Sequence, residues 1–347
     1  MNHRSVFLTS SVALALALVA ISPRVHGSEV LGAGASLPAP VYAKWAQAYR
    51  KTSGNKIVYQ SIGSGSGVAQ ITAQSVDFGA SDTPLGDTAL EKAGLLQFPT
   101  LLGGVVPIVN LPNTKAGEVR LTGALLADIY LGKITTWDDS AIAQANSGKS
   151  LPKISIAVIR RSDSAGTTLM FTDYLSKASP DWKTRVGRGV TVAWPIGLGG
   201  KGDEGVAKFV QRLPGAIGFV DYGYAFSHSL VFTQLKNQSG NFVSPGPDSI
   251  GAAVSSGWEN SGFSEGLTDA QGQNAWPIAG ATLVLIRKVQ DKPEQAKEVV
   301  RFFAWAYKFG APAANESNYV PLAASTVRAI ADRWQLVRDG KGKPLME

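Results

Sequence analysis

The sequence predicts an α/β fold with a mostly parallel sheet. Short apolar stretches rich in β-branched residues alternate with amphipathic stretches of helical periodicity along the chain. Strands that alternate with helices are typical of such sheets. Two further apolar stretches, 101–105 and 276–281, are rich in small residues, and we expect them to be strands that pass between two lobes. The first lobe would then be built from both ends of the chain.

The first elements alternate regularly. Residues 38–51 predict a helix that buries Val41, Trp45 and Tyr49 along one face. A strand with a β-branched centre follows at 56–60, then a loop of small residues at 61–67 and a short helix. Residues 77–82 predict a short strand and a turn.

The later elements continue this alternation. Apolar stretches predict strands at 105–111, 154–159, 216–220 and 281–286. A helix over 203–213 follows a glycine-rich turn. A last strong helix opens near Pro293 and stops at Gly310.

The first 27 residues have the pattern of a secretory leader. His3 and Arg4 precede an unbroken apolar run at 12–21, and small or modest residues follow at 25–27. The run is shorter than a standard membrane span, so a retained anchor is the less favoured alternative. We expect cleavage near Gly27 and, because the chain has no Cys, no lipid on an N-terminal cysteine. The mature protein is predicted to be soluble in the periplasm.

The composition argues against several kinds of chemistry. The chain is 44% hydrophobic and 17% charged, which is ordinary for a globular protein. Without Cys it has no thiolate nucleophile or Cys-ligated metal, and one His, His228, remains beyond the leader. The formal charge of +7 favours anionic partners, but the basic residues are scattered, which does not single out nucleic acid. We expect no metal, no cofactor and no nucleic acid.

Three places share one design, in which a strand leads through a loop of Gly, Ala and Ser into a helix. They lie at 34–38, 63–67 and 164–168. The start of a helix offers unpaired backbone N–H groups and a partial positive charge, and small residues let an anion come close. For any one loop, Ser and Thr that simply cap the helix are the more common explanation. Three such loops in one α/β chain favour an oxyanion site, because strand-to-helix loops gather at one end of a sheet.

Two charged residues stand beside these loops. Arg161 follows a predicted strand, and its planar fork suits bidentate binding of a tetrahedral anion; Arg160 is the alternative. Asp82 is an acceptor for the P–O–H group that phosphate carries at neutral pH, whereas sulfate has no such proton and would be repelled. The alternative for Asp82 is a turn residue before Pro84. The residues therefore favour phosphate as the anion.

Two other motifs are weak. Residues 197–202 match the G-x-G-x-x-G pattern of dinucleotide sites, but Trp194 and Pro195 before them disfavour a regular central strand. A glycine-rich turn into the helix at 203–213 is the better explanation. The region around Ser64 is not a nucleophile elbow, because Ile62 and Ser66 occupy the positions that require glycine.

Several segments together resemble the periplasmic phosphate-binding proteins of phosphate-specific ABC transporters, over essentially the whole mature chain. The segments are GAGASLPAPVYAKW at 32–45, DFGASD at 77–82, QFP at 97–99, YLGKI at 130–134, WPIGLGGKG at 194–202 and AWPI at 275–278. The resemblance implies a type 2 periplasmic binding fold, with two α/β lobes, two crossover strands and the ligand in the cleft between the lobes. The expected divisions are a signal peptide at 1–27, lobe I at 28–102 and 278–347, and lobe II at 103–277.

The resemblance also implies the site residues. The phosphate contacts would be Ser36, Leu37, Ser64, Asp82, Arg161, Ala165, Gly166 and Thr167, with Asp163 orienting Arg161 and Ser164 in support. The family usually has Thr at the position of Ser36, and Ser keeps the hydroxyl. It usually has Ser at the position of Ala165, so a side-chain donor is lost there although an N–H remains. We expect binding to weaken by about 0.5–1.5 kcal/mol at most.

The implied function is capture of inorganic phosphate and its delivery to the permease subunits of a phosphate ABC transporter. The chain would act as a monomer, without enzymatic activity. Three alternatives stay open: a binder of sulfate or another oxyanion, a secreted phosphoryl-transfer enzyme built on carboxylates and Ser, and a sensor that signals instead of transporting.

Overall fold

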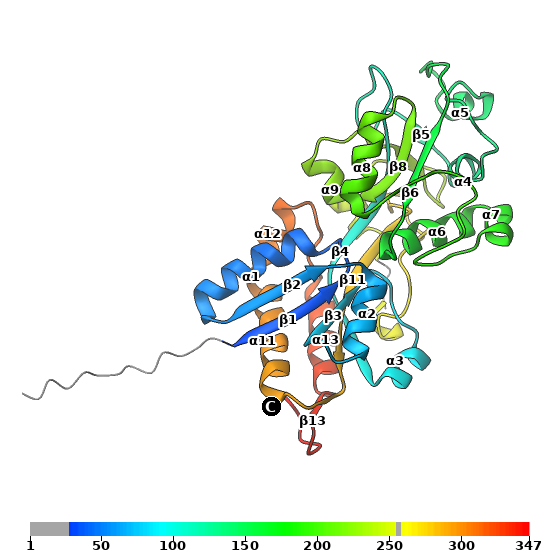
Figure 1. The fold of residues 1–347 in the computed structure, drawn as a ribbon. Coiled ribbons are helices and arrows are strands. Elements are labelled where there is room, and N and C mark those ends of the chain that lie inside the picture. Colours follow the sequence, from blue (N-terminus) through cyan, green and yellow to red (C-terminus); the bar gives the residue numbers. More distant parts are fainter. Residues whose placement is uncertain (1–27, 255–257, 347) are drawn as a thin grey trace, which may run out of the picture.

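The computed structural model describes residues 28–254 and 258–346, so the predicted signal peptide lies outside the described residues. Its main sheet has eight strands in the order β2-β1-β3-β11-β4-β8-β6-β7 (Figure 1). These strands are β1 (Glu29–Gly34), β2 (Lys56–Ser61), β3 (Phe78–Ser81), β4 (Leu95–Val109), β6 (Ala157–Arg161), β7 (Leu198–Gly200), β8 (Ala216–Asp221) and β11 (Ala279–Arg287).

Two small sheets and a set of helices complete the described fold. The small sheets join β5 (Arg120–Leu121), β9 (Gln234–Lys236) and β10 (Phe242–Val243), and β12 (Val289–Gln290) and β13 (Arg338–Asp339). The helices in order along the chain are first α1 (Ala39–Ser53), α2 (Ser64–Thr72), α3 (Asp87–Ala93), α4 (Gly123–Tyr130), α5 (Ser140–Ala145), α6 (Gly166–Ala178) and α7 (Pro180–Arg185). The later ones are α8 (Gly202–Arg212), α9 (Tyr222–Ser227), α10 (Pro247–Gly251), the short 3₁₀ helix η1 (Trp258–Ser261), α11 (Pro293–Phe309), α12 (Ala311–Glu316) and α13 (Ala324–Trp334). Among the described helices, none is long and apolar enough to cross a membrane.

The long strands β4 and β11 connect the two lobes. β4 pairs with β11 through Gly104 and with β8 from Val105 onward, so its partner changes in mid-strand. The stretch predicted at 101–105 lies inside β4, and the stretch at 276–281 leads into β11. The expectation of two lobes and two crossover strands is confirmed. The divisions expected after residues 102 and 277 stay a prediction, and the change of partner falls two residues after the first of them.

The sheet is mixed but mostly parallel, as expected, with four parallel and three antiparallel pairs of neighbouring strands. Within each lobe the strands pair in parallel, β1 with β2 and β3, and β6 with β7 and β8. The crossover strands run the other way, so β11 is antiparallel to β3 and β4, and β4 is antiparallel to β8. A regular alternation of strands and helices does not reveal this reversal, because the direction of a crossover strand depends on the end at which the chain passes into each lobe.

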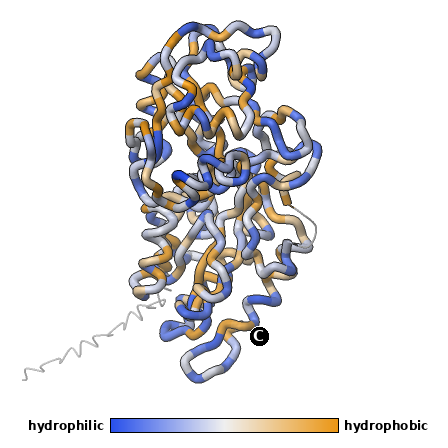
Figure 2. Tube along the Cα trace, turned by 90° about the vertical axis from the view of Figure 1, so that its right-hand side faces the viewer, coloured by the Kyte–Doolittle hydropathy of each residue, from blue (hydrophilic) through white to orange (hydrophobic). Residues whose placement is uncertain are grey.

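Lobe I is closed by contacts between the two ends of the chain. Trp45 of α1 donates its indole N–H to the carbonyl of Gly310, and Tyr49 donates to Glu298 of α11 at 2.6 Å. The Tyr42 hydroxyl lies 2.7 Å from that of Thr100 on β4. Figure 2 shows hydrophobic segments running through the interior of both lobes, with hydrophilic segments mostly on the outer loops. These buried contacts make lobe I a discontinuous unit.

The strand expected at 105–111 is the second half of β4, which begins at Leu95 and ends at Val109. Two predicted boundaries next to the candidate site were also wrong. The second helix was expected after the loop at 61–67, but α2 already begins at Ser64, because Gly63, with φ of 92°, turns the chain straight from β2 into the helix. The strand expected at 154–159 begins at Ala157 and extends to Arg161, while the backbone of Ile154 hydrogen-bonds to Trp137. Both shifts bring residues of the candidate site to the ends of regular elements.

Gly67 sets the distance between α2 and the strands beneath it. A Cβ atom there would lie 2.4 Å from Cα of Gly34 and 2.8 Å from the carbonyl oxygen of Ala80. Both neighbours are backbone atoms, which cannot rotate away. The close approach of α2 to the ends of β1 and β3 therefore requires glycine.

We predict that Gly67→Ala destabilises the protein by about 1–3 kcal/mol, because overpacking against backbone outweighs the better helix propensity of Ala. Urea unfolding measures the effect. Gly86→Ala is the matched control, since nothing lies within 4 Å of the added atom. Equal stability of the two variants would contradict the close packing described here.

Candidate anion-binding site

The helices that begin at the three glycine-rich loops have no side-chain caps. The N-cap residues are Pro38 for α1, Gly63 for α2 and Ala165 for α6, and no side chain hydrogen-bonds to the first turn at any of them. The alternative explanation, in which Ser or Thr simply caps these helices, is therefore wrong. The backbone N–H groups of three helix starts are not occupied by such caps, as an anion site requires.

The first two loops are held together by backbone hydrogen bonds. The N–H of Ala35 donates to the carbonyl of Ala80 at 2.9 Å, and the N–H groups of Ile62 and Gly63 both donate to the carbonyl of Gly34 at 2.9 Å. At the end of β3, the N–H of Asp82 donates to Oγ of Ser64 at 3.1 Å. Asp82 is thereby fixed between the starts of α1 and α2.

The third loop, at 164–168 in lobe II, approaches Ser64 and Asp82 of lobe I. A Cβ atom on Gly166 would lie 2.5 Å from Oγ of Ser64 and 3.0 Å from Oδ2 of Asp82. A Cβ atom on Gly65 would lie 2.4 Å from Oγ of Ser164. The lobes therefore meet at these loops, and glycine is needed where they come closest. The structure thus brings Ser64 and Asp82 of lobe I to Ser164 and Gly166 of lobe II.

Arg161, at the end of β6, is almost completely buried, with 2% of its surface exposed. Its Nε and Nη2 donate to the two oxygens of Asp163 at 2.8 and 2.6 Å. Its Nη1 donates to Oγ1 of Thr167 and to Oδ1 of Asp203, both at 2.8 Å. Arg160, the alternative considered from the sequence, donates to the carbonyl of Arg161.

The donor count of Arg161 changes the expected mode of binding. A guanidinium has five N–H groups, and the four bonds above use all but one N–H of Nη2. The planar fork faces Asp163 and not the cleft, so in this arrangement Arg161 cannot grip an anion with two N–H groups. The Oγ1 of Thr167, which accepts from Arg161, keeps its own O–H free to donate.

Asp82 is an acceptor with one unused oxygen. It is 3% exposed, and its Oδ1 accepts from the hydroxyl of Thr282 on β11 at 2.6 Å. Its Oδ2 is buried and has no partner among the described residues. Burial raises the pKa of Asp82 to about 7, against the lowering effects of the Thr282 hydroxyl, Arg161 and the N–H of Leu37. Nearby Asp203 raises that pKa further.

The other charged groups respond to the same environment. Burial and the neighbouring Asp163 raise the pKa of Asp203, although Arg161 opposes them. The pKa of Asp163 is lowered despite burial, because Arg161 and the N–H of Gly202 stabilise its charged form. The carboxylates of Asp163 and Asp203 raise the pKa of Arg161, although burial acts in the opposite direction. The guanidinium therefore stays charged.

Sequence reasoning missed Asp203 and Thr282. Asp203 is the second residue of α8, directly after the glycine-rich turn that had been set aside as a weak dinucleotide motif. In the same turn, the N–H of Gly202 donates to Oδ1 of Asp163 at 3.1 Å. The turn and the residue that follows it thus supply two contacts to the ion pair of Arg161 and Asp163. An acidic residue after it was a signal that could have been used, whereas Thr282 sits in an apolar strand and gave none.

One expectation about a single residue changes. The N–H of Ala165, expected to serve the ligand, donates to the carbonyl of Val190 at 3.0 Å, because Ala165 is the extended N-cap residue of α6. His228 is exposed at the end of α9, where its Nδ1 lies 2.9 Å from the carbonyl of Tyr224, and it has no part in the site. Within the described ranges, no group of His, Asp and Glu is arranged to hold a metal ion.

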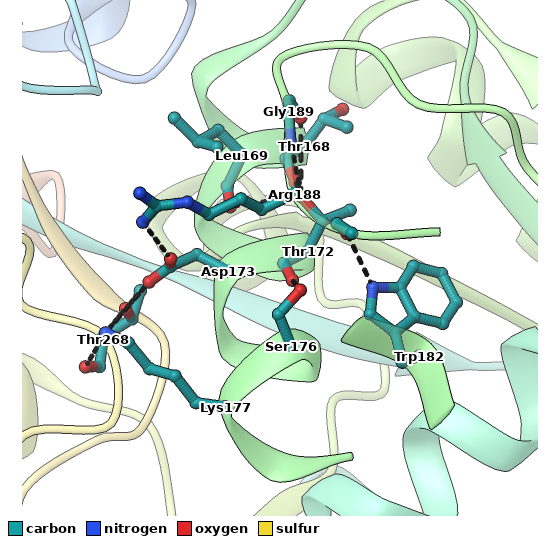
Figure 3. A network of polar contacts seen from close by, with 11 residues as sticks. Thr168, Leu169, Thr172, Asp173, Ser176, Lys177, Trp182, Arg188, Gly189 and Thr268 are labelled. Carbon is teal, nitrogen blue, oxygen red and sulfur yellow. Dashed lines mark hydrogen bonds and ion pairs between the residues drawn. The ribbon is translucent and has the colours of Figure 1, made fainter. Parts of the chain in front are cut away.

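A cavity of about 390 Å³ opens between the lobes on one side of Asp82, with Met170 and Asp173 of α6 in its wall. Asp173 accepts from Arg188 at 2.7 Å and pairs with Lys177 at 2.9 Å (Figure 3). The hydroxyl of Thr268 also hydrogen-bonds to Asp173. These contacts fasten the segment around Thr268 to α6, the helix whose N-terminus faces the site.

The chain is similar to known proteins over most of its length. Residues 20–304 match the PBP superfamily domain. The chain is 46% identical over 337 residues to the phosphate-binding protein PstS of Pasteurella multocida, which covers 96% of this chain and 98% of that protein. It is 48% identical over 315 residues to the phosphate-binding protein PstS of Haemophilus influenzae, covering 90% of this chain and 94% of that protein.

Solved structures show the same fold at lower identity. A human phosphate binding apolipoprotein has a TM-score of 0.70 and 20% identity, covering 87% of this chain and 93% of that chain. A phosphate-binding protein from Stenotrophomonas maltophilia has a TM-score of 0.66 and 20% identity, covering 88% of this chain and 93% of that chain.

The raised pKa of Asp82 predicts how the stability of the empty protein depends on pH. Between its ordinary value of 3.8 and about 7, the folded protein holds a proton on Asp82 that the unfolded chain has lost. Stability from this group therefore falls as pH rises through that window. Asp82→Asn removes the effect, so the variant should gain up to ~4 kcal/mol relative to the natural protein between about pH 4 and 7. Denaturant unfolding without phosphate measures the stability of both proteins. Parallel pH profiles of their unfolding free energies would contradict the raised pKa.

Proposed function

Because the chain belongs to the family of periplasmic phosphate-binding proteins within the PBP superfamily, we propose that it captures inorganic phosphate in the cleft between its lobes. We further propose that it delivers the phosphate to the permease subunits of a phosphate ABC transporter. The mature protein would work in the periplasm as a monomer, after loss of the leader predicted at 1–27.

The buried Oδ2 of Asp82 carries this proposal. A carboxylate without a partner is costly in a dry site, and a ligand that brings a hydrogen-bond donor removes that cost. Phosphate brings a P–O–H group at neutral pH, whereas sulfate has no proton to donate. Oδ2 of Asp82 is an acceptor at three helix starts, where anions are favoured. The site therefore selects an oxyanion that carries a proton over one that does not.

The remaining groups around Asp82 are donors for the other oxygens of phosphate. On lobe I we expect these to be the hydroxyls of Ser36 and Ser64 and the N–H of Leu37, which also hydrogen-bonds to Asp82. On lobe II they are the N–H of Gly166, the hydroxyl of Thr167 and the last free N–H of Arg161. Together they replace the water that phosphate loses in the cleft. Ala165 shapes this loop but contributes no N–H of its own.

Binding by both lobes couples capture to delivery. Loops of lobe I and lobe II must meet for every donor to reach the ligand, so phosphate favours the closed arrangement over an open one. The crossover strands β4 and β11 are the connections about which the lobes would open. A transporter that recognises the closed form would then receive loaded protein in preference to empty protein.

We predict that the protein with its ligand stripped binds phosphate at neutral pH and does not bind sulfate. Asp82→Asn should weaken phosphate binding by about ten- to a hundredfold and narrow the difference from sulfate, because the acceptor for P–O–H is lost. Titration calorimetry measures both anions. Asp138→Asn, an exposed change of the same chemistry, is the control. Comparable binding of both anions by the natural protein would remove Asp82 from this role.

We also predict that the protein does not hydrolyse phosphate esters. Ser64 accepts from the backbone of Asp82, and Thr167 accepts from Arg161, so both hydroxyls near the site serve as fixed contacts. Incubation with p-nitrophenyl phosphate should release no nitrophenol above a blank without protein. Turnover that disappears in Ser64→Ala would show a phosphoryl-transfer enzyme instead.

A further inference from the structure

Asp203 gives the site an excess of negative charge. Its side chain is 7% exposed and its Oδ1 lies 2.8 Å from Nη1 of Arg161. The same guanidinium is already paired with Asp163 at 2.6 Å. Two carboxylates therefore share one cation before any ligand enters. A single ion pair would be neutral, whereas this triad carries one negative charge.

Further acids face Asp203 from the elements around it. Asp221, at the end of β8, is 1% exposed; its Oδ1 accepts from the Tyr224 N–H at 3.0 Å and from the Tyr319 hydroxyl, while its Oδ2 has no partner among the described residues. The charged and titratable groups that interact with Asp203 are Arg161 on β6, Asp163 in the loop after it, Asp82 after β3, Asp221, Tyr224 on α9 and Tyr319 after α12. Of these groups, Arg161 is the one cation.

Phosphate in its dianionic form would add to this excess. The dianion HPO₄²⁻ brings two charges into a buried cluster of carboxylates, and its single P–O–H satisfies one acceptor, Oδ2 of Asp82. Arg161 has one N–H left, so it cannot compensate with a bidentate contact. Unpaired charge is expensive in a dry site, and the usual response of buried groups is to take up a proton.

We propose that Asp203 makes phosphate capture by this chain proton-coupled, so that the closed site holds one proton more than HPO₄²⁻ brings. The proton lies on phosphate, as H₂PO₄⁻, or on a carboxyl group that faces it, and the two descriptions have the same stoichiometry. The unpartnered, buried Oδ2 of Asp82 marks where the ligand meets the cluster. This inference rests on the proposed function, since it concerns phosphate in the same site.

The test is titration calorimetry of the natural protein with phosphate at about pH 8, in two buffers with different ionisation enthalpies. At that pH free phosphate is mainly the dianion, so the difference in heat between the buffers counts the protons taken up on binding. We expect about one proton per phosphate, with affinity falling up to about tenfold per pH unit above neutrality. Uptake near zero would overturn the inference. Absence of phosphate binding at both neutral pH and pH 8 would instead contradict the proposed function.

Two variants at neighbouring positions of α8 test whether Asp203 causes the proton uptake. Asp203→Asn should reduce the uptake to near zero and make affinity less dependent on pH, because one negative charge leaves the cluster. Glu204→Gln is the matched control, since Glu204 is exposed on the same helix and pairs with Lys208. It should bind like the natural protein. Unchanged uptake in a folded Asp203→Asn protein would overturn the role of Asp203. If that variant does not fold, the count for the natural protein still decides the proposal.

Discussion

The buried guanidinium of Arg161 is the interaction on which the site depends. A charge that is 2% exposed must be neutralised inside the protein. Its partners come from the loop after β6, from α6 and from α8, so the ion-pair network fixes three elements of lobe II relative to one another. The same bonds use most of its donors. Arg161 is therefore mainly a fixed positive charge that orients the hydroxyl of Thr167, and it offers the ligand little hydrogen bonding of its own.

The fold explains why these groups meet the acceptor from the other lobe. Within each lobe, parallel strands end at the same edge, so their loops gather there. The crossover strands then place the loop edge of one lobe against that of the other, and β11 also supplies Thr282 to Asp82. Glycines at 63, 65 and 166 remove the side chains that would keep the loops apart. The result is a close contact between the lobes, where the buried, unpartnered Oδ2 of Asp82 can accept a hydrogen bond from a ligand that carries a proton.

Much of this arrangement could be predicted from the sequence, because local patterns encode it. Helical periodicity, glycine-rich loops after strands, and polar residues at strand ends located the three loops, Asp82 and Arg161. What could not be predicted depends on distant neighbours. The donor count of Arg161 required the position of Asp203, 42 residues further along the chain. The loss of the Ala165 N–H required Val190 beside it, and Thr282 looked like part of an apolar strand until β11 was placed next to β3.

A crystal structure of the protein grown with phosphate at neutral pH shows directly whether the ligand meets Oδ2 of Asp82. We expect phosphate enclosed between the three loops, with one of its oxygens within hydrogen-bond distance of Oδ2 of Asp82, and Arg161 still paired with both Asp163 and Asp203. Phosphate bound elsewhere, or an Asp82 carboxylate turned away from the ligand, would contradict this expectation.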